Sequence, residues 1–241
     1  MRVDEGDMEE DVKKSLIFTR ELSRIYRLGD SEVIGINRVD LDIAEGDLVV
    51  LKGNSGSGKS TLLSVLAGLD RATSGTVSVN GYDLNHADAG ALTRFRREVV
   101  GMIFQSFNLL PTLNVLENVC LPALLAGSPL SAAEPKAADL LAWLGLSDRL
   151  RHLPAQLAGG EMQRTAIARA LINDPAVILA DEPTGNLDSR NGRTVMEMLA
   201  ELNRKWGRTV MIATHSDLAD PFAGTTIFLK DGMILDRPCD I

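Results

Sequence analysis

A glycine-rich octapeptide constrains the fold of this 241-residue chain more than any other feature of its sequence. Residues 53–60 fit the pattern G-x-x-x-x-G-K-S, follow an apolar strand pattern at 47–52 and precede a helical pattern at 60–67. A strand that turns through such a loop into a helix is typical of α/β folds, which place their ligands at the carboxyl ends of parallel strands. The octapeptide therefore predicts an α/β protein with a mainly parallel core sheet.

The same octapeptide predicts a phosphate-binding loop. Its glycines let successive backbone N–H groups turn inward around phosphate oxygens, and the N-terminus of the following helix adds a positive dipole. Lys59 can reach the β- and γ-phosphates, and the Ser60 hydroxyl can bind Mg²⁺. A plain Gly/Ser turn before a helix is the alternative, but it leaves the lysine and the hydroxyl unexplained. The expected ligands of a nucleotide are Gly53, Asn54, Ser55, Gly56, Ser57, Gly58, Lys59, Ser60 and Thr61.

Two adjacent carboxylates follow another buried-strand pattern. The apolar run at 176–180 ends in Asp181 and Glu182, at the edge where open α/β sheets place their ligands. Asp181 can hold Mg²⁺, and Glu182 can orient or deprotonate an attacking water. Alone, the pair could be a solvated loop. Together with the phosphate-binding loop, it predicts a site that transfers a phosphoryl group to water.

Short β-branched runs alternate with helical patterns along most of the chain. The first eighty residues are richer in strands, whereas residues 106–158 are mostly helix and loop. This distribution predicts a β-rich edge and a helical insert around one core. The expected strands are 16–19, 47–52, 75–79, 99–104, 177–179, 209–213 and 225–229, and the expected helices are 60–67, 132–144, 161–172 and 189–206.

The charge of the chain disfavours nucleic acid as a partner. It carries 25 Lys and Arg against 33 Asp and Glu, and the resulting net charge of −8 has the wrong sign for a surface that neutralises nucleic-acid phosphates. Part of the acidity lies in the first eleven residues, which we expect to form a solvated tail.

The chain lacks the sequence marks of membrane insertion and of secretion. No apolar run approaches the ~20 residues that cross a bilayer, and the first residues are acidic where a secretory signal would be basic and then apolar. Cys120 and Cys239 show no ligand spacing, so we expect ordinary thiols. These features predict a cytoplasmic chain that does not itself span a membrane.

A second glycine-backed helix start separates this chain from most proteins with a phosphate-binding loop. Residues 157–164 read Leu-Ala-Gly-Gly-Glu-Met-Gln-Arg and run directly into a helical pattern, so they form a second helix N-terminus that can face an anion. This segment resembles the signature of the ABC ATPases. Taken alone, it could also be a glycine turn that caps a helix.

The resemblance covers nearly the whole chain after residue 15 and implies the family's fold. That fold is a P-loop NTPase with a RecA-like core sheet, an N-terminal antiparallel β subdomain and an α-helical insert subdomain. Residues 1–15 are then an acidic tail and residues 16–241 a single ABC ATPase domain, with the helical subdomain at about 106–158. The resemblance also implies a homodimer in which the signature of one chain closes on ATP held by the other. Its expected ATP contacts are Ala158, Gly159, Gly160 and Glu161.

Further residues match the family in order along the chain. Gln105 corresponds to the glutamine that senses Mg²⁺ and the attacking water, and His215 to the histidine that contacts the γ-phosphate. Asp188 lies in the loop that crosses the dimer, and Tyr26 lies where the family places an aromatic ring that stacks on adenine. The implied catalytic residues are Glu182, His215 and Gln105, and the implied Mg²⁺ ligands are Ser60, Gln105 and Asp181.

Residues 105–111 and 180–188 look like a narrower branch, the lipoprotein-releasing and macrolide-exporting ATPases and the related cell-division ATPase. In that branch, ATP-driven closure of the dimer powers a membrane partner. The resemblance implies a separate transmembrane permease, at the inner face of the cell membrane, for export or mechanical extraction of a substrate. The permease is expected to dock near Gln105 and the segment Phe107, Asn108, Leu109 and Leu110.

Ala158 departs from the family pattern, which usually has a serine here that contacts the γ-phosphate across the dimer. The missing hydroxyl leaves open an alternative, an ATP-dependent switch with slow turnover in a non-transport membrane complex. Other classes fit less well. The sequence between Lys59 and Asp181 lacks the long heptad segments of DNA-repair and chromosome-organising ATPases. The sequence has one phosphate loop where a tandem translation factor needs two, and it has no Asn-Lys-x-Asp element of the small GTPases.

Overall fold

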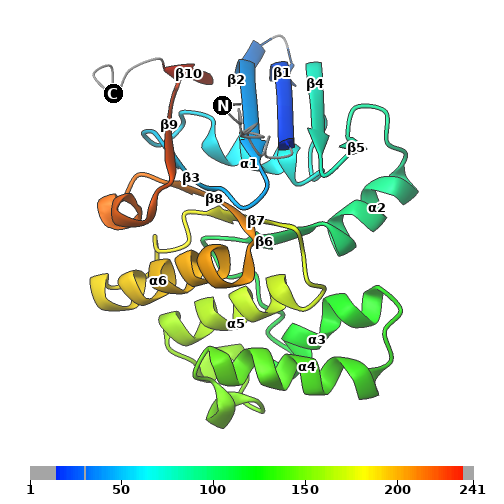
Figure 1. Cartoon of the computed structure of the whole chain (residues 1–241), viewed down its shortest axis with the longest axis vertical. Coiled ribbons are helices and arrows are strands. Elements are labelled where there is room, and N and C mark those ends of the chain that lie inside the picture. The colour runs from blue at the N-terminus through cyan, green and yellow to red at the C-terminus, as the bar shows by residue number, and fades with distance from the viewer. Residues whose placement is uncertain (1–14, 30, 236–241) are drawn as a thin grey trace, which may run out of the picture.

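The computed structural model describes residues 15–29 and 31–235 (Figure 1). The expected acidic tail lies outside these residues, apart from Ser15. The strands are β1 (Ser15–Leu28), β2 (Ser31–Ala44), β3 (Leu48–Lys52), β4 (Ser74–Val79), β5 (Tyr82–Asp83), β6 (Val100–Ile103), β7 (Val177–Asp181), β8 (Thr209–Thr214), β9 (Thr225–Lys230) and β10 (Met233–Leu235). The helices are α1 (Lys59–Leu66), α2 (Ala89–Glu98), α3 (Val115–Leu125), α4 (Leu130–Trp143), α5 (Gly159–Leu171) and α6 (Ser189–Trp206), with short 3-10 helices η1 (Ser147–Arg149), η2 (Pro154–Gln156) and η3 (Asp217–Phe222).

The central sheet has six strands in the order β10-β9-β3-β8-β7-β6. All neighbouring pairs are parallel except β10 with β9. The strands β3, β7 and β8 are nearly continuous apolar runs, as expected of parallel strands that are covered on both faces. The mainly parallel core sheet is therefore confirmed.

Alternate residues of this sheet belong to two hydrophobic cores, because successive side chains of a strand point to opposite faces. On β3, Val50 lies in the core formed with α3, α4, α5 and α6. Val49 and Leu51 lie in the core formed with α1, α2 and the antiparallel strands. The six-stranded sheet is thus the middle layer of the molecule, as Figure 1 shows.

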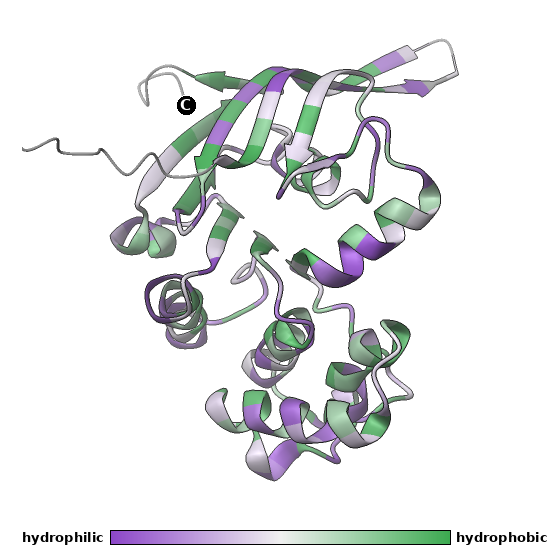
Figure 2. Cartoon of the chain, turned by 45° about the vertical axis from the view of Figure 1, so that its right-hand side comes forward, coloured by the Kyte–Doolittle hydropathy of each residue, from purple (hydrophilic) through white to green (hydrophobic). Residues whose placement is uncertain are grey.

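A smaller antiparallel sheet has the order β2-β1-β4-β5 and lies beside α1 (Figure 1). Hydrophobic and hydrophilic residues alternate along its strands, which gives the ribbon a banded appearance in Figure 2. In the second half of β2, for example, Val39, Leu41 and Ile43 are buried while Asp40 and Asp42 between them are exposed. One face of this sheet therefore completes the core around α1.

Helices α3 and α4 lie in the chain between β6 and α5, and they pack with α5 at the end of the molecule away from the antiparallel sheet (Figure 1). Together with the two sheets, they give the expected arrangement of a mainly parallel core sheet, an antiparallel β part and a helical part. The boundaries at 16–241 and about 106–158 stay predictions. No helix among the described residues is both long and apolar enough to cross a bilayer.

Two helices were not predicted from the sequence. In α2, only Leu92 and Phe95 of ten residues are buried, so its apolar stripe is too short to stand out. In α3, Pro122 lacks an N–H donor and usually marks the end of a helix. The helix nevertheless continues, and the Ala126 N–H donates to the Pro122 carbonyl at 3.0 Å.

Candidate active site

The phosphate-binding loop joins β3 to α1 and depends on glycine at two close approaches. Gly58 immediately precedes α1 with φ 104°, and a Cβ there would lie 2.3 Å from the Gly35 carbonyl oxygen. A Cβ on Gly53 would lie 2.2 Å from the Leu229 carbonyl oxygen. Side chains at either position would collide with main chain that cannot yield. Glycine at these two positions therefore lets the loop keep the compact path in which its backbone N–H groups can face a phosphate.

Lys59 is the first residue of α1 and is only 6% exposed. Its Nζ donates to the carbonyl oxygens of Gly53 and Asn54 at 2.7 and 3.1 Å, so the side chain curls over the loop. The same Nζ lies 3.6 Å from Glu182 Oε1. The one cation of the loop thus stands between the loop and the carboxylates that follow β7.

Ser60 and Asp181 face each other across the start of α1 and the end of β7. The Ser60 hydroxyl donates to Asp181 Oδ1 at 3.0 Å. Burial raises the pKa of Asp181 above its ordinary value, and the nearby charge of Glu182 raises it further against the opposing effects of Ser60 and Lys59. A cation bound at Asp181 would offset the free-energy cost of burying its negative charge.

The described residues contain no cluster of three or more His, Cys, Asp or Glu side chains that could hold a metal ion by themselves. The hydroxyl of Ser60 and the carboxylate of Asp181 suit a different kind of site. Mg²⁺ commonly uses one or two protein oxygens and completes its shell with substrate phosphates and water. The pair fits such a site.

Glu182 is held by groups from β8 and the residue that follows it. The Thr214 hydroxyl donates to Glu182 Oε2 at 3.1 Å, and His215 Nδ1 lies 2.9 Å from Oε1. Glu182 itself has φ 45°, in the left-handed region that non-glycine residues rarely adopt. The carboxylate of Glu182 thus lies within 3.6 Å of Lys59 and 2.9 Å of His215.

Gln105 follows the end of β6, and the loop after Glu182 holds it in place. The Asn186 side chain donates to the Gln105 carbonyl at 2.9 Å. A Cβ on Gly185 would lie 2.8 Å from Gln105 Nε2, so the amide rests directly on this glycine. The position of Gln105 therefore depends on the chain that leaves β7.

Tyr26 is placed by β1 and fixed at its hydroxyl, which donates to Asp70 Oδ2 at 2.8 Å. The guanidinium of Arg24 lies over its ring, 4.4 Å from the centroid. The ring is therefore rigidly oriented, and its stacking on adenine stays a prediction.

A cavity of about 410 Å³ gathers most of the expected site residues. Tyr26, Gln105, Glu182 and His215 line it together with residues 55–61 of the phosphate-binding loop. The glycine turn at 157–161 does not line this cavity. Within one chain, the start of α1 thus lies at the cavity, and the glycine turn at the start of α5 lies outside it.

The second helix start has its own local support. Ala158 immediately precedes α5, and its N–H donates to the Glu161 carboxylate at 2.9 Å. A Cβ on Gly160 would lie 2.6 Å from Asn191 Oδ1, and Asp188 accepts from the Asn191 N–H at 2.9 Å. The glycine turn therefore packs against the segment that Asp188 caps.

Comparisons with known proteins identify the family. The model of the ABC transporter family matches residues 36–185, which include the phosphate-binding loop and the glycine turn. The chain belongs to the ABC transporter family. It is an ABC-type ATPase that binds and hydrolyses ATP.

Three relatives show how far the similarity extends. The chain is 47% identical to a macrolide export ATP-binding/permease protein MacB of Rhodopseudomonas palustris, over 92% of this chain but 34% of that protein. It thus spans about a third of the MacB relative's length. It is 42% identical to the ABC transporter ATP-binding protein Rv0986 of Mycobacterium tuberculosis, over 92% of this chain and 90% of that one. The ATP-binding cassette MJ0796, solved as a dimer after hydrolysis with ADP and Pi bound, superposes with a TM-score of 0.86 at 38% identity, over 92% of this chain and 97% of that one.

The sequence did not reveal several residues that shape the site of this ABC ATPase. Thr214 holds Glu182, and as a polar residue ending an otherwise apolar strand it carried a weak signal. Asp70 holds Tyr26 from 44 residues away, with no pattern to connect them. Gly185 lies within the family motif at 180–188, but its contact with Gln105 is visible only in three dimensions.

Proposed function

We propose that this chain is the ATP-driven motor of a transporter, in which two copies close around ATP and drive a membrane-spanning permease. The observation that carries the proposal is the division of the site. Lys59 and Glu182 lie at the 410 Å³ cavity, whereas the glycine turn at 158–161 is outside it. A second copy of the chain can supply that turn to the first cavity, and the dimeric cassette MJ0796 supports this arrangement.

The geometry supports a role for each residue at the cavity. Lys59 and the backbone N–H groups of the loop bind the phosphates, and Glu182 accepts a proton from the water that attacks the γ-phosphorus as the bond to ADP breaks. His215, 2.9 Å from Glu182, contacts the γ-phosphate and orients that carboxylate. Mg²⁺, held by Ser60 and Asp181 with Gln105 nearby, would neutralise charge on the phosphates.

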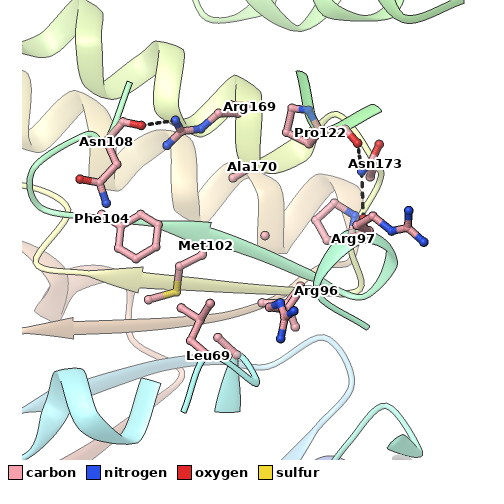
Figure 3. Close-up of a pocket in the computed structure, with 14 residues that line it drawn as sticks. Leu69, Arg96, Arg97, Met102, Phe104, Asn108, Pro122, Arg169, Ala170 and Asn173 are labelled. Atoms are coloured by element: carbon pink, nitrogen blue, oxygen red, sulfur yellow. Dashed lines mark hydrogen bonds between the residues drawn. The ribbon is translucent and has the colours of Figure 1, made fainter. Parts of the chain in front are cut away.

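A groove beside the core sheet supports docking of the permease. It encloses about 320 Å³, and its apolar lining includes Leu69, Met102 and Phe104 (Figure 3). The segment after Gln105 forms part of its rim through Asn108, and Leu110 farther along is 44% exposed. A short amphipathic helix of the permease would fit here and would hold the chain at the inner face of the membrane. The macrolide export relative, which joins an ATP-binding part to a permease, is in keeping with such a partner.

The variant Glu182→Gln tests the dimer. It should bind ATP, lose at least about a hundredfold in turnover and elute as a stable dimer with ATP and Mg²⁺, because ATP then persists between the two chains. The double variant Lys59→Ala/Glu182→Gln is the control and should elute as a monomer. A Glu182→Gln protein that stays monomeric at high concentration, or that hydrolyses ATP at the parent rate, contradicts the proposal.

A pair of matched leucine variants tests the docking groove. Leu110→Glu should release the chain from the membrane fraction of its own cells while its ATP affinity stays unchanged. Leu153→Glu is the control, because Leu153 is similarly exposed at 42% but belongs neither to the expected docking segment 107–110 nor to the residues that line the groove. Equal membrane association of the two variants contradicts docking at this surface, and failure of Leu110→Glu to fold means that the leucine packs internally instead.

A further inference from the structure

Two consecutive residues after Gln105 adopt a conformation that is unfavourable for their side chains. Phe107 and Asn108 have φ values of 60° and 50°, in the left-handed region. A single asparagine is often found in the left-handed region, but a phenylalanine is not. Two consecutive residues in this conformation therefore require stabilising contacts from the surrounding structure. The short turn is otherwise closed by main-chain bonds, from the Phe107 N–H to the Phe104 carbonyl and from the Asn108 N–H to the Ser106 carbonyl.

Arg169 of α5 supplies this support. Its Nη2 donates to the Phe107 carbonyl at 2.8 Å and its Nη1 donates to the Asn108 carbonyl (Figure 3). In the part of the chain that the structure describes, no carboxylate forms an ion pair with Arg169, so its partly buried charge is directed at these two main-chain oxygens. The fork of a guanidinium fits two adjacent carbonyls, and hydrogen bonds from a charged donor are stronger than neutral ones.

Asn118 of α3 holds the next part of the same loop. Its buried amide accepts from the Leu110 N–H at 2.8 Å and donates to the carbonyls of Leu110, Leu113 and Asn114 at 2.9–3.1 Å. The segment after Gln105 is therefore fastened to the helical part of the molecule at two points. Gln105, in contrast, contacts the chain that leaves β7, through Asn186 and Gly185.

The helix that carries Arg169 also begins at the glycine turn. Gly159, the first residue of α5, and Arg169, near its last turn, are ten residues apart, which is about 15 Å along one rigid helix. A displacement of the glycine turn, when a second copy closes on it, is thus transmitted by α5 to the carbonyls of Phe107 and Asn108. These lie two and three residues from Gln105.

We propose that Arg169 is a positioning residue for ATP hydrolysis, which holds the Phe107–Asn108 turn so that Gln105 reaches the nucleotide, and which links the glycine turn of α5 to that glutamine. The inference rests on the proposed role of Gln105. Arg169 touches neither nucleotide nor water in this scheme, and its effect passes entirely through the loop.

A double-mutant cycle in the full chain tests the link. Arg169→Met and Gln105→Ala should each lower kcat about tenfold or more, the size expected for loss of charge-assisted hydrogen bonds and of a site residue, with ATP affinity by calorimetry nearly unchanged. The double variant should be no slower than Gln105→Ala alone, because Arg169 acts through that residue. Hydrogen exchange should accelerate at residues 105–113 in Arg169→Met and stay unchanged at 53–61.

Two further variants make the cycle specific. Arg193→Met is the matched control, because Arg193 is an exposed arginine of α6 paired with Glu197, and its kcat should equal that of the parent. Arg169→Lys should recover part of the lost kcat, since an ammonium can reach one carbonyl but not both. If Arg169→Met does not fold, the cycle is run with Arg169→Lys.

The outcomes separate the inference from the proposed function. If Gln105→Ala keeps the parent kcat, the proposed role of Gln105 fails and the inference fails with it. If Gln105→Ala slows turnover but Arg169→Met does not, the inference alone is overturned. Multiplicative effects in the double variant, or a loss of ATP affinity as large as the loss of kcat, also overturn it, because Arg169 would then act independently of Gln105 or only on the fold.

Discussion

Replacing Ala158 by serine should change both the stability of the chain and its turnover. Ala158 immediately precedes α5 with φ −70° and ψ 157°, the extended conformation of a helix N-cap, and it offers no side-chain hydrogen bond. Its N–H already donates to the Glu161 carboxylate at 2.9 Å. A serine hydroxyl here would accept from the N–H of Gly160 or Glu161, and with Glu161 would complete a reciprocal capping box.

The gain in stability from a serine at this N-cap can be estimated. Exchange of alanine for serine at an N-cap is worth typically ~1 kcal/mol, which for a domain of this size corresponds to a rise in Tm of about 2–4 °C. This gain needs no nucleotide and no second copy. It should be seen in thermal unfolding of the isolated chain.

The expected effect on the rate of ATP turnover is separate from the effect on stability and requires the closed dimer. A serine oxygen can accept from the backbone while its O–H donates to a phosphate oxygen, so the cap and the phosphate contact do not compete. A hydrogen bond to a charged oxygen is worth ~1.5–3 kcal/mol, and its gain where charge develops would raise turnover by roughly ten- to a hundredfold. Ala158→Ser should therefore be faster than the parent, with the affinity of the monomer for ATP little changed.

The variant Ala158→Asp separates the effect on stability from the effect on turnover. Aspartate also caps a helix, so it should raise Tm, but its charge opposes a phosphate and should slow turnover. Thermal unfolding without nucleotide and a steady-state ATPase assay on the three proteins decide the matter. An unchanged Tm in Ala158→Ser refutes the capping estimate. A serine variant no faster than the parent, or an aspartate variant as fast as the serine one, refutes the contact between position 158 and the γ-phosphate.

Three further variants probe the candidate active site. Lys59→Ala should abolish tight ATP binding in calorimetry, because it removes the loop's only side-chain cation; nearly unchanged affinity would contradict the phosphate-binding loop. Burial raises the pKa of Asp181, so the stability this group contributes is present at low pH and lost as pH rises through the raised value. Asp181→Asn should therefore raise the Tm of the nucleotide-free chain at neutral pH, by a margin that shrinks towards acid pH. Gly185→Ala places a Cβ 2.8 Å from Gln105 Nε2 and should lower kcat about tenfold or more without weakening ATP binding. The control Gly90→Ala should leave kcat unchanged.

The edge of the sheet at which the expected site residues gather could be predicted from the sequence, because these residues adjoin strong local patterns. The phosphate-binding loop and the Asp181–Glu182 pair each follow an apolar strand directly, so finding the strand also finds the site. The antiparallel sheet was predicted only in outline. Along β2, Ile34 and Ile36 alternate in one phase and Val39, Leu41 and Ile43 in the other, because the strand is irregular near Arg38, which has φ 50°. Such an irregularity hides a strand of fourteen residues from a search for strict alternation.

Contacts between segments far apart in the chain escaped the sequence for a different reason. Arg169 donates to main-chain carbonyls 61 and 62 residues away. Every residue has a main-chain carbonyl, so the sequence does not indicate which ones accept these hydrogen bonds. The side-chain amide of Asn118 likewise forms hydrogen bonds with main-chain atoms. Residues that act on the backbone of a distant loop can be identified only once the fold has brought the two segments together.

The topology of the sheet also explains why the site divides as it does. The residues that line the cavity leave the carboxyl ends of parallel neighbours: Lys59 after β3, Gln105 after β6, Glu182 after β7 and His215 after β8. A parallel sheet gathers such residues at one edge without further help. The glycine turn at 158–161 follows η2 rather than a strand of this sheet, so no feature of the sheet brings it to that edge. Under the proposed function, a second copy of the chain would supply further phosphate contacts with its own α5, and the Glu182→Gln dimer would make that approach visible.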